Sequence, residues 1–336
     1  MIDQKFPLID LHRHIEGSIR IKTILDLAQL HNLYLPADDI QSLRPFVQVY
    51  NPQPGVMAFI EKIKLAASVL ADYAACERVA YENVLDADDE GLDYVELRFS
   101  PYFMAEAHEL NPTMVVESVI NGVNQAQKER GIKVKLIGIL SRTYGPDIAY
   151  QELSAFIEHK EFISGLDLAG DEAAFPGKYF IDHIKIARQS GWMITIHAGE
   201  SSGPESVRQA IQELGANRIG HGVRAVEDPG LMEMIAERGI GIEANLTSNV
   251  QTSTVKDYAS HPLRKFLELG LLATINTDDP VISQINIKHE YETACPAAGL
   301  SVDQIHQAQR NALKVAFLSE IEKEDLMQPY IQDKSS

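Results

Sequence analysis

Two histidines, His12 and His14, stand two residues apart after a short apolar run that begins at Pro7. Side chains alternate between the two faces of a strand, so residues two apart point in the same direction. Both imidazoles could therefore bind one metal ion, as histidines do in zinc sites. The pair alone is a weak signal, because two polar residues that merely end a strand have the same spacing.

Three later apolar runs end in the same kinds of side chain. His197 and Glu200 follow one run, His221 follows the next, and the adjacent Asp278 and Asp279 follow the last. Imidazoles and a carboxylate without a thiolate suit Zn²⁺, although iron, nickel and cobalt remain chemically possible. These groups are too few for two ions, so we expect a single metal. Glu200 stands three residues past His197, where it could reach the water or the substrate without being a ligand.

Eight short apolar runs rich in β-branched residues recur along the chain, and each ends abruptly in polar residues. They are typical of buried strands, and amphipathic stretches with helical spacing separate the later ones. This alternation predicts an α/β fold, a (β/α)8 TIM barrel, whose strands all end at one face and would bring the polar residues together there. A doubly wound open sheet is disfavoured because no glycine-rich phosphate loop follows the first run. The expected strands fall within residues 7–14, 92–100, 134–142, 163–170, 193–200, 218–223, 240–249 and 272–279.

Helical patterns fill the segments between these runs. A long one over residues 21–90 predicts extra helices inserted between the first two strands, near the barrel mouth. We interpret its apolar face at Val56–Ile63 as packing against the outer helices; the alternative is a hydrophobic cover over the site. Other helical stretches are often followed by a glycine before the next strand, where a helix C-terminal glycine belongs. The clearest of them cover residues 152–159, 180–189, 205–214, 229–238 and 262–269.

No linker or repeat divides the chain, so we expect a single domain over residues 1–336. The barrel and its inserted helices would occupy residues 7–318, with a closing helix at 305–318 and a frayed tail at 328–336.

The 48 acidic and 30 basic side chains give a net charge of −18, which argues against nucleic acid as a partner because phosphate binding needs clustered Lys and Arg. No run approaches the ~18 apolar residues of a membrane span, and the first residues lack the apolar core of a signal peptide. Two cysteines, Cys76 and Cys295, cannot make a disulfide framework. We therefore expect a cytoplasmic protein without a membrane contact.

Five ordered motifs together resemble bacterial members of the adenosine deaminase family, and the resemblance extends from Pro7 to about Leu318. It implies a zinc-dependent (β/α)8 hydrolase whose partner is a small-molecule purine nucleoside. Such enzymes convert adenosine and 2′-deoxyadenosine to inosine and 2′-deoxyinosine with release of ammonia, in purine salvage or catabolism. The motifs are Asp10–His14, His197–Glu200, Arg218–Gly222, Leu246–Thr252 and Asn276–Pro280.

The resemblance also implies a role for each residue. Glu200 would deliver a proton to purine N1, which makes C6 a better electrophile and typically contributes ~10²–10⁴-fold. His221 would take the proton from the attacking hydroxide or steer that hydroxide electrostatically. A zinc ion lowers the pKa of water to about 7 and so supplies the hydroxide. One zinc ion per chain would be held by His12, His14, His197 and Asp278.

The substrate-binding residues implied by the resemblance are His14, Glu16, Gly170 and Asp279. Asp279 would orient the hydroxide and hydrogen-bond purine N7, and the backbone of Gly170 would meet N3. At Glu16 the chain departs from the family, which usually has an aspartate that contacts the ribose 5′-hydroxyl.

Two alternatives follow from these residues. Adenine deaminases, which act on the free base, carry glutamate at the position of Glu16. Against that activity, such relatives have an aspartate before the histidine of the motif that reads Arg218–His221 here, and the Leu246–Thr252 motif is similar to that of the nucleoside enzymes. A catalytically silent nucleoside-binding protein is the second alternative, and it is disfavoured because Glu200 and all the implied ligands are present.

Overall fold

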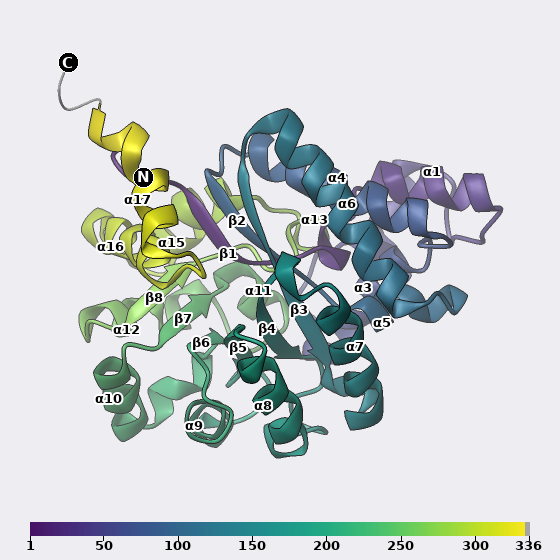
Figure 1. Ribbon diagram of the computed structural model, residues 1–336. Coiled ribbons are helices and arrows are strands. Elements are labelled where there is room, and N and C mark those ends of the chain that lie inside the picture. Colours follow the sequence, from purple (N-terminus) through teal and green to yellow (C-terminus); the bar gives the residue numbers. More distant parts are fainter. Residues whose placement is uncertain (333–336) are drawn as a thin grey trace.

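Eight parallel strands form one sheet in the order of the sequence in this computed structural model, which describes residues 1–332 (Figure 1). An isolated parallel bridge between Arg13 and Asp278 joins the first strand to the end of the last. Two 2.8 Å backbone hydrogen bonds support it, from His14 N–H to Asp278 O and from Asp278 N–H to His12 O. The sheet thus closes, and the predicted (β/α)8 barrel is confirmed. The strands are β1 (Ile9–His14), β2 (Tyr94–Phe99), β3 (Lys133–Ser141), β4 (Ile163–Ala169), β5 (Met193–Ala198), β6 (Arg218–His221), β7 (Gly241–Ala244) and β8 (Leu272–Ile275).

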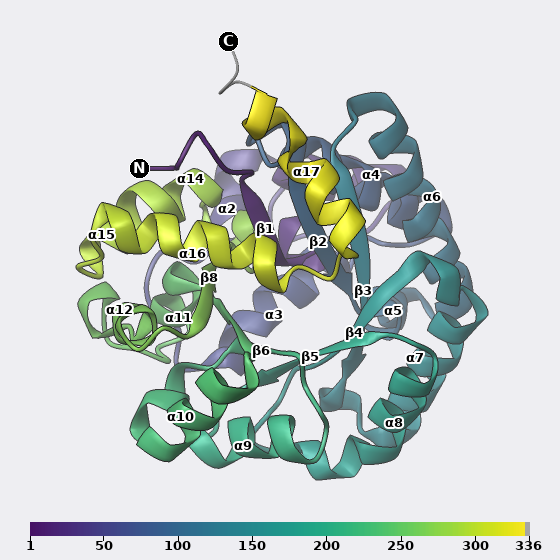
Figure 2. The same cartoon turned by 60° about the vertical axis from the view of Figure 1, so that its left-hand side comes forward.

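An outer layer of helices surrounds the strands. Figure 2 shows α16 lying across the ends of β1 and β8, both of which it contacts. Gly239 ends α10 with a φ of 63°, a left-handed conformation that glycine adopts at little cost, as its position after a helical pattern predicts. The outer helices are α4 (Tyr73–Asp89), α6 (Pro112–Arg130), α7 (Pro146–Glu158), α8 (Ile181–Gln189), α9 (Pro204–Gln212), α10 (Pro229–Arg238), α12 (Leu263–Glu268) and α16 (Val302–Val315).

Three further helices precede α4 in the segment between β1 and β2, as the helical pattern predicts. They are α1 (Ile21–His31), α2 (Ile40–Val47) and α3 (Val56–Ala67), and Figure 1 shows α1 and α3 together on one side of the strands. The apolar face of α3 lines the cavity at the barrel mouth. This position agrees with the hydrophobic cover and not with our main interpretation, packing against the outer helices.

The seventh strand is shorter than expected. β7 ends at Ala244, and residues 246–249 of the predicted strand belong instead to the helix α11 (Leu246–Gln251). Within it, Asn249 N–H donates to Asn245 O at 2.9 Å, so the backbone bonds locally after the chain leaves the sheet. The run was mistaken for a strand because every residue from Gly241 to Asn249 is buried, and a short buried run has no periodicity that separates strand from helix.

The C-terminal segment also differs from expectation. The closing helix α16 ends at Val315, and the helix α17 (Glu320–Gln332) follows where a frayed tail was expected from residue 328. Tyr330 Oη donates to Asp93 Oδ2 at 2.7 Å and ties α17 to the body of the molecule. The expected tail at 333–336 lies outside the described residues. Among residues 1–332, no helix has the length and apolar character needed to cross a membrane.

Candidate active site

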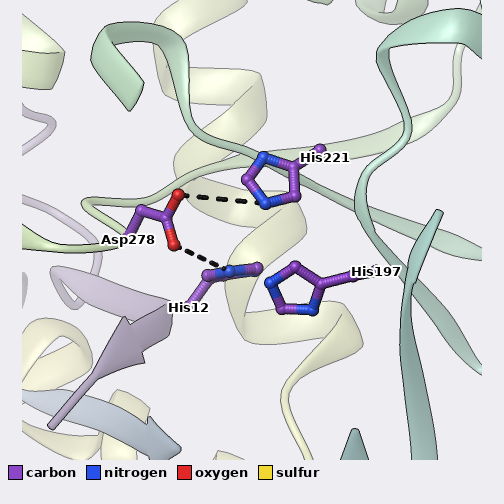
Figure 3. A group of neighbouring side chains, drawn as sticks. All are labelled: His12, His197, His221 and Asp278. Atoms are coloured by element: carbon purple, nitrogen blue, oxygen red, sulfur yellow. Dashed lines mark ion pairs between the residues drawn. The ribbon is translucent and has the colours of Figure 1, made fainter. Parts of the chain in front are cut away.

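Four buried side chains from distant parts of the chain meet at the carboxyl ends of the strands (Figure 3). His12 lies in β1, His197 lies in β5, His221 ends β6, and Asp278 follows β8. One nitrogen or oxygen of each lies within 4.8 Å of the others. Asp278 Oδ1 is 3.1 Å from His12 Nε2, and Asp278 Oδ2 is 3.8 Å from His221 Nε2. This arrangement could hold a metal ion.

His14 joins the same group. Its Nε2 lies 3.3 Å from His12 Nε2 and 3.3 Å from Asp278 Oδ1. The structure thus brings together all four residues to which the sequence analysis assigned the metal, and it places His221 among them. Imidazole nitrogens and a carboxylate oxygen fit a divalent transition metal such as Zn²⁺.

The backbone is strained where two of these side chains enter the site. His221 has a φ of 62° and Asp278 a φ of 66°, in the left-handed region that residues other than glycine seldom adopt. Each such residue typically costs about 1–3 kcal/mol, so the surrounding fold must hold it in place. Gly220 leaves room for the ring of His12, since a Cβ at Gly220 would lie 3.1 Å from His12 Cε1. The strained backbone conformations of His221 and Asp278 direct their side chains into the site.

Buried carboxylates lie behind two of the histidines. His12 Nδ1 is 2.7 Å from Glu243 Oε2, and His197 Nδ1 is 2.9 Å from Asp167 Oδ2. Arg98 pairs with both acids, at 2.9 Å to Glu243 and 2.7 Å to Asp167. A carboxylate that accepts Nδ1–H leaves the Nε2 lone pair free for a metal, which is the usual arrangement behind a ligating histidine.

Arginines keep these two carboxylates ionised. Burial alone raises the pKa of Glu243, but the guanidinium groups of Arg98 and Arg218 hold it well below its usual range. For Asp167, burial is likewise outweighed by His197 and Arg98, and the pKa is lowered. These residues were not predicted from the sequence, although a charged residue inside a buried apolar strand is a signal that could have found them.

Glu200 lies beside His221, with Oε2 3.6 Å from Nε2 of the imidazole. Burial, and then the charges of Asp278 and Glu172, raise the pKa of Glu200 well above its usual range. The raised pKa favours the protonated carboxyl group, which can donate its proton to a base in the cavity.

Glu172, another residue that the sequence analysis missed, fixes the loop that carries Glu200. Its carboxylate accepts backbone N–H groups from Gly199 at 2.7 Å, Glu200 at 3.2 Å, Ser201 at 2.9 Å and Ser202 at 3.0 Å. Four bonds to one buried carboxylate hold this turn rigidly, so the position of Glu200 depends on Glu172.

One cavity contains the remaining predicted residues. Its apolar wall includes Phe59, Ile60 and Ile63 of α3, and its polar wall lies at the strand ends. Such a mixture of an apolar surface with a few converging polar groups is typical of a small-molecule site. The predicted residues that line it are His14, Glu16, Gly170, His197, Glu200, His221, Asp278 and Asp279.

Two carboxyl oxygens in this cavity have no hydrogen-bond partner among the described residues, Glu16 Oε2 and Asp279 Oδ1. The other oxygen of Glu16 accepts the backbone N–H of Ser100 at 2.7 Å, and burial raises the pKa of Glu16 to about 7. A Cβ at Gly17 would lie 1.6 Å from Asp279 Oδ1, so only glycine allows this approach. Because unpaired buried polar atoms are costly, both oxygens are suited to bind a polar ligand.

Comparisons with known proteins agree with this geometry. A family model described as adenosine deaminase matches residues 7–332. An adenosine deaminase of Serratia proteamaculans (strain 568) is 56% identical over 326 residues, covering 97% of this chain and 98% of the relative. The solved structure of adenine deaminase from Arthrobacter aurescens has a TM-score of 0.88 at 24% identity and covers 98% of this chain and 100% of that one. The solved structure of an amidohydrolase from Burkholderia ambifaria with bound Zn has the same TM-score and identity, and the match covers 98% of this chain and 90% of that one.

Proposed function

The chain belongs to the adenosine deaminase family, and from that premise we propose how the residues at its barrel mouth perform the reaction. The protein is a hydrolytic deaminase that converts adenosine and 2′-deoxyadenosine to inosine and 2′-deoxyinosine with release of ammonia. The observation that carries the proposed mechanism is Glu200, a buried carboxyl group with a raised pKa beside the cluster of imidazoles.

A single zinc ion is proposed as the cofactor, held by His12, His14, His197 and Asp278. The donor set supports this assignment, because all four residues offer nitrogen or oxygen atoms close together and carboxylates lie behind His12 and His197. When bound, Zn²⁺ lowers the pKa of water to about 7 and supplies hydroxide at neutral pH.

Each side chain around the purine would then have its own role in the reaction. Glu200 protonates N1, which withdraws electron density from the ring and lets C6 accept the attacking oxygen. His221 lies beside that oxygen, Asp279 orients it and hydrogen-bonds N7, and the backbone of Gly170 meets N3. The apolar face of α3 excludes bulk water above the ring.

Glu16 is proposed to accept the 5′-hydroxyl of the ribose through its unpaired Oε2. A site built around a substrate hydroxyl discriminates strongly against a ligand that lacks it, because a buried polar atom is left unsatisfied. We therefore expect adenine to be at least ~10³-fold less efficient than adenosine in kcat/KM. Adenosine monophosphate should be rejected, since its phosphate would meet the carboxyl group of Glu16.

A substrate panel with metal analysis on the same sample tests the proposal. Adenosine, 2′-deoxyadenosine, adenine and adenosine monophosphate are compared by the fall in purine absorbance, with about one zinc ion expected per chain. Glu16→Gln should lower kcat/KM for the nucleosides and leave the metal content unchanged. A preference for adenine would reject the role of Glu16 and favour the free base as substrate.

The proposed setting is a single catalytic domain in the cytoplasm. Both cysteines, Cys76 and Cys295, are free and buried, which suits a reducing compartment.

A further inference from the structure

His221 differs from the other buried histidines of the site in what lies behind it. Its Nδ1 is 2.9 Å from the side-chain Nδ2 of Asn249 and 3.2 Å from that of Asn245. An amide nitrogen can only donate a hydrogen bond, so an Asn249 in this orientation requires Nδ1 of His221 to be an acceptor. The protonation of the imidazole therefore depends on which way the amide of Asn249 points.

His261 fixes that orientation. The backbone N–H of Leu263 donates to His261 Nδ1 at 3.1 Å, so this nitrogen cannot carry a proton. Burial lowers the pKa of His261 to about 3, so the ring is neutral and its single proton lies on Nε2. Nε2 is 3.1 Å from Asn249 Oδ1, to which it donates. The amide nitrogen of Asn249 must consequently face His221.

We propose that Asn249 and His261 are positioning residues that hold His221 as the Nε2–H tautomer, with this N–H directed at the reacting atoms. The proposal rests on the deaminase mechanism above and deepens it. A neutral His221 in this tautomer has no lone pair on Nε2, so it neither binds the metal nor accepts a proton there. It acts as a hydrogen-bond donor to the oxygen that attacks C6.

The surroundings of Nε2 agree with a donor. Glu200 Oε2 lies 3.6 Å from it and Asp278 Oδ2 lies 3.8 Å from it, so carboxyl oxygens face this side of the ring. The opposite tautomer would set Nδ1–H of His221 against the N–H of Asn249, whose orientation His261 fixes. Of the two roles that the sequence left open for His221, proton acceptor or electrostatic guide, the hydrogen bonds select the second.

Asn249→Asp tests the proposal, because it replaces the donor by an acceptor of nearly the same shape. Long-range ¹⁵N–¹H NMR on the labelled zinc enzyme reports which ring nitrogen of His221 carries the proton, with His221→Ala for assignment. We expect Nε2–H in the parent protein and Nδ1–H in Asn249→Asp. Loss of a donor to the developing negative charge should lower kcat for adenosine by roughly 10²–10³-fold, while KM changes little.

Variants of His261 provide a second test if Asn249→Asp does not fold. His261→Leu removes the donor that orients Asn249 and should give a mixture of tautomers with a lower kcat. His261→Gln keeps a donor near the position of Nε2 and should restore much of the Nε2–H tautomer of His221 and much of the kcat. His183→Leu is the matched control, because His183 is another buried imidazole, located in α8, and its loss should leave the tautomer of His221 unchanged.

Two results would overturn the proposal. The first is Nδ1–H on His221 in the parent protein. The second is an unchanged tautomer and kcat in Asn249→Asp, or in His261→Leu if Asn249→Asp does not fold. Failure of the deaminase assignment would look different. In that case the parent protein would not convert adenosine, whereas the NMR spectrum would still report the tautomer.

Discussion

The two sides of the histidine cluster use the same side chain in different ways. On the carboxylate side, His12 and His197 have Glu243 and Asp167 behind their Nδ1 atoms. On the amide side, His221 has Asn249 in that place. All three rings lie close together, with His221 5.0 Å from each of the other two between ring centroids. Distance to the centre of the cluster therefore does not distinguish the proposed metal ligands from the proposed hydrogen-bond donor, whereas the group behind each ring does.

The two sides are also built from different elements. The carboxylate side consists of strand residues whose charges are tied together by Arg98, the partner of both Asp167 and Glu243. The amide side consists of neutral groups on α11 and at the start of α12, connected through His261. A carboxylate behind a metal-binding imidazole increases the basicity of that imidazole. The neutral hydrogen bonds from His261 through Asn249 instead fix which nitrogen of His221 carries the proton.

Loss of a ligand should give the largest difference between the two sides. His12→Ala or His197→Ala is expected to remove the metal and reduce deamination to background, because the ion generates the nucleophile. His221→Ala should keep about one metal ion per chain while it loses activity. Metal content and adenosine turnover are measured on the same samples. A metal-free but fully active His12→Ala enzyme, or loss of the ion in His221→Ala, would contradict the comparison.

Glu200→Gln comes next in expected effect. Glutamine keeps the shape of the side chain but cannot deliver a proton to N1, so kcat should fall by at least ~10²-fold while the metal stays bound. If this variant loses the metal in proportion to its activity, Glu200 is a ligand and belongs with the carboxylate side.

Asp167→Asn probes the carboxylate side without removing a ligand. An amide behind His197 is a weaker acceptor, and its N–H can favour the wrong tautomer, so metal affinity should fall by about 10–100-fold. Affinity is measured by competition with a chelator, and the thermal midpoint is recorded as well. Glu152→Gln is the matched control, since Glu152 is equally buried but bonds to Ser100 and to the backbone N–H of Ser141. It should lower the thermal midpoint, with little change in metal affinity.

The smallest effect concerns the support of the amide side. Glu290 accepts the backbone N–H of Thr247 in α11 at 3.3 Å, and burial raises its pKa to about 8 from an ordinary value of 4.5. Between these pH values the folded state binds more protons than the unfolded state, so this group's stabilising contribution falls as the pH rises and is lost once the pH passes about 8. Glu290→Gln should flatten this slope in denaturant unfolding measured from pH 5 to pH 9. An identical slope in both proteins would mean that Glu290 is ionised in the folded protein.

The sequence was sufficient to predict the barrel and the polar strand ends. Period-two spacing placed His12 and His14 on one side of a strand, and the strand–helix alternation placed His197, His221 and Asp278 at the same face. It failed where the chain leaves β7, because the buried run of α11 carries no helical period. It also gave no role to Glu172, whose bonds to the loop of Glu200 span 27 residues or more.

By itself, then, the sequence determined which chemical groups reach the barrel mouth, since residue type and local period are both written in the chain. Only the tertiary structure decided which group lies behind each imidazole. His12 meets Glu243 across 231 positions, and His221 meets Asn249 across 28. The tautomer of a histidine is set by the partner of its far nitrogen, and no local pattern of residues specifies a partner that the fold supplies from another element.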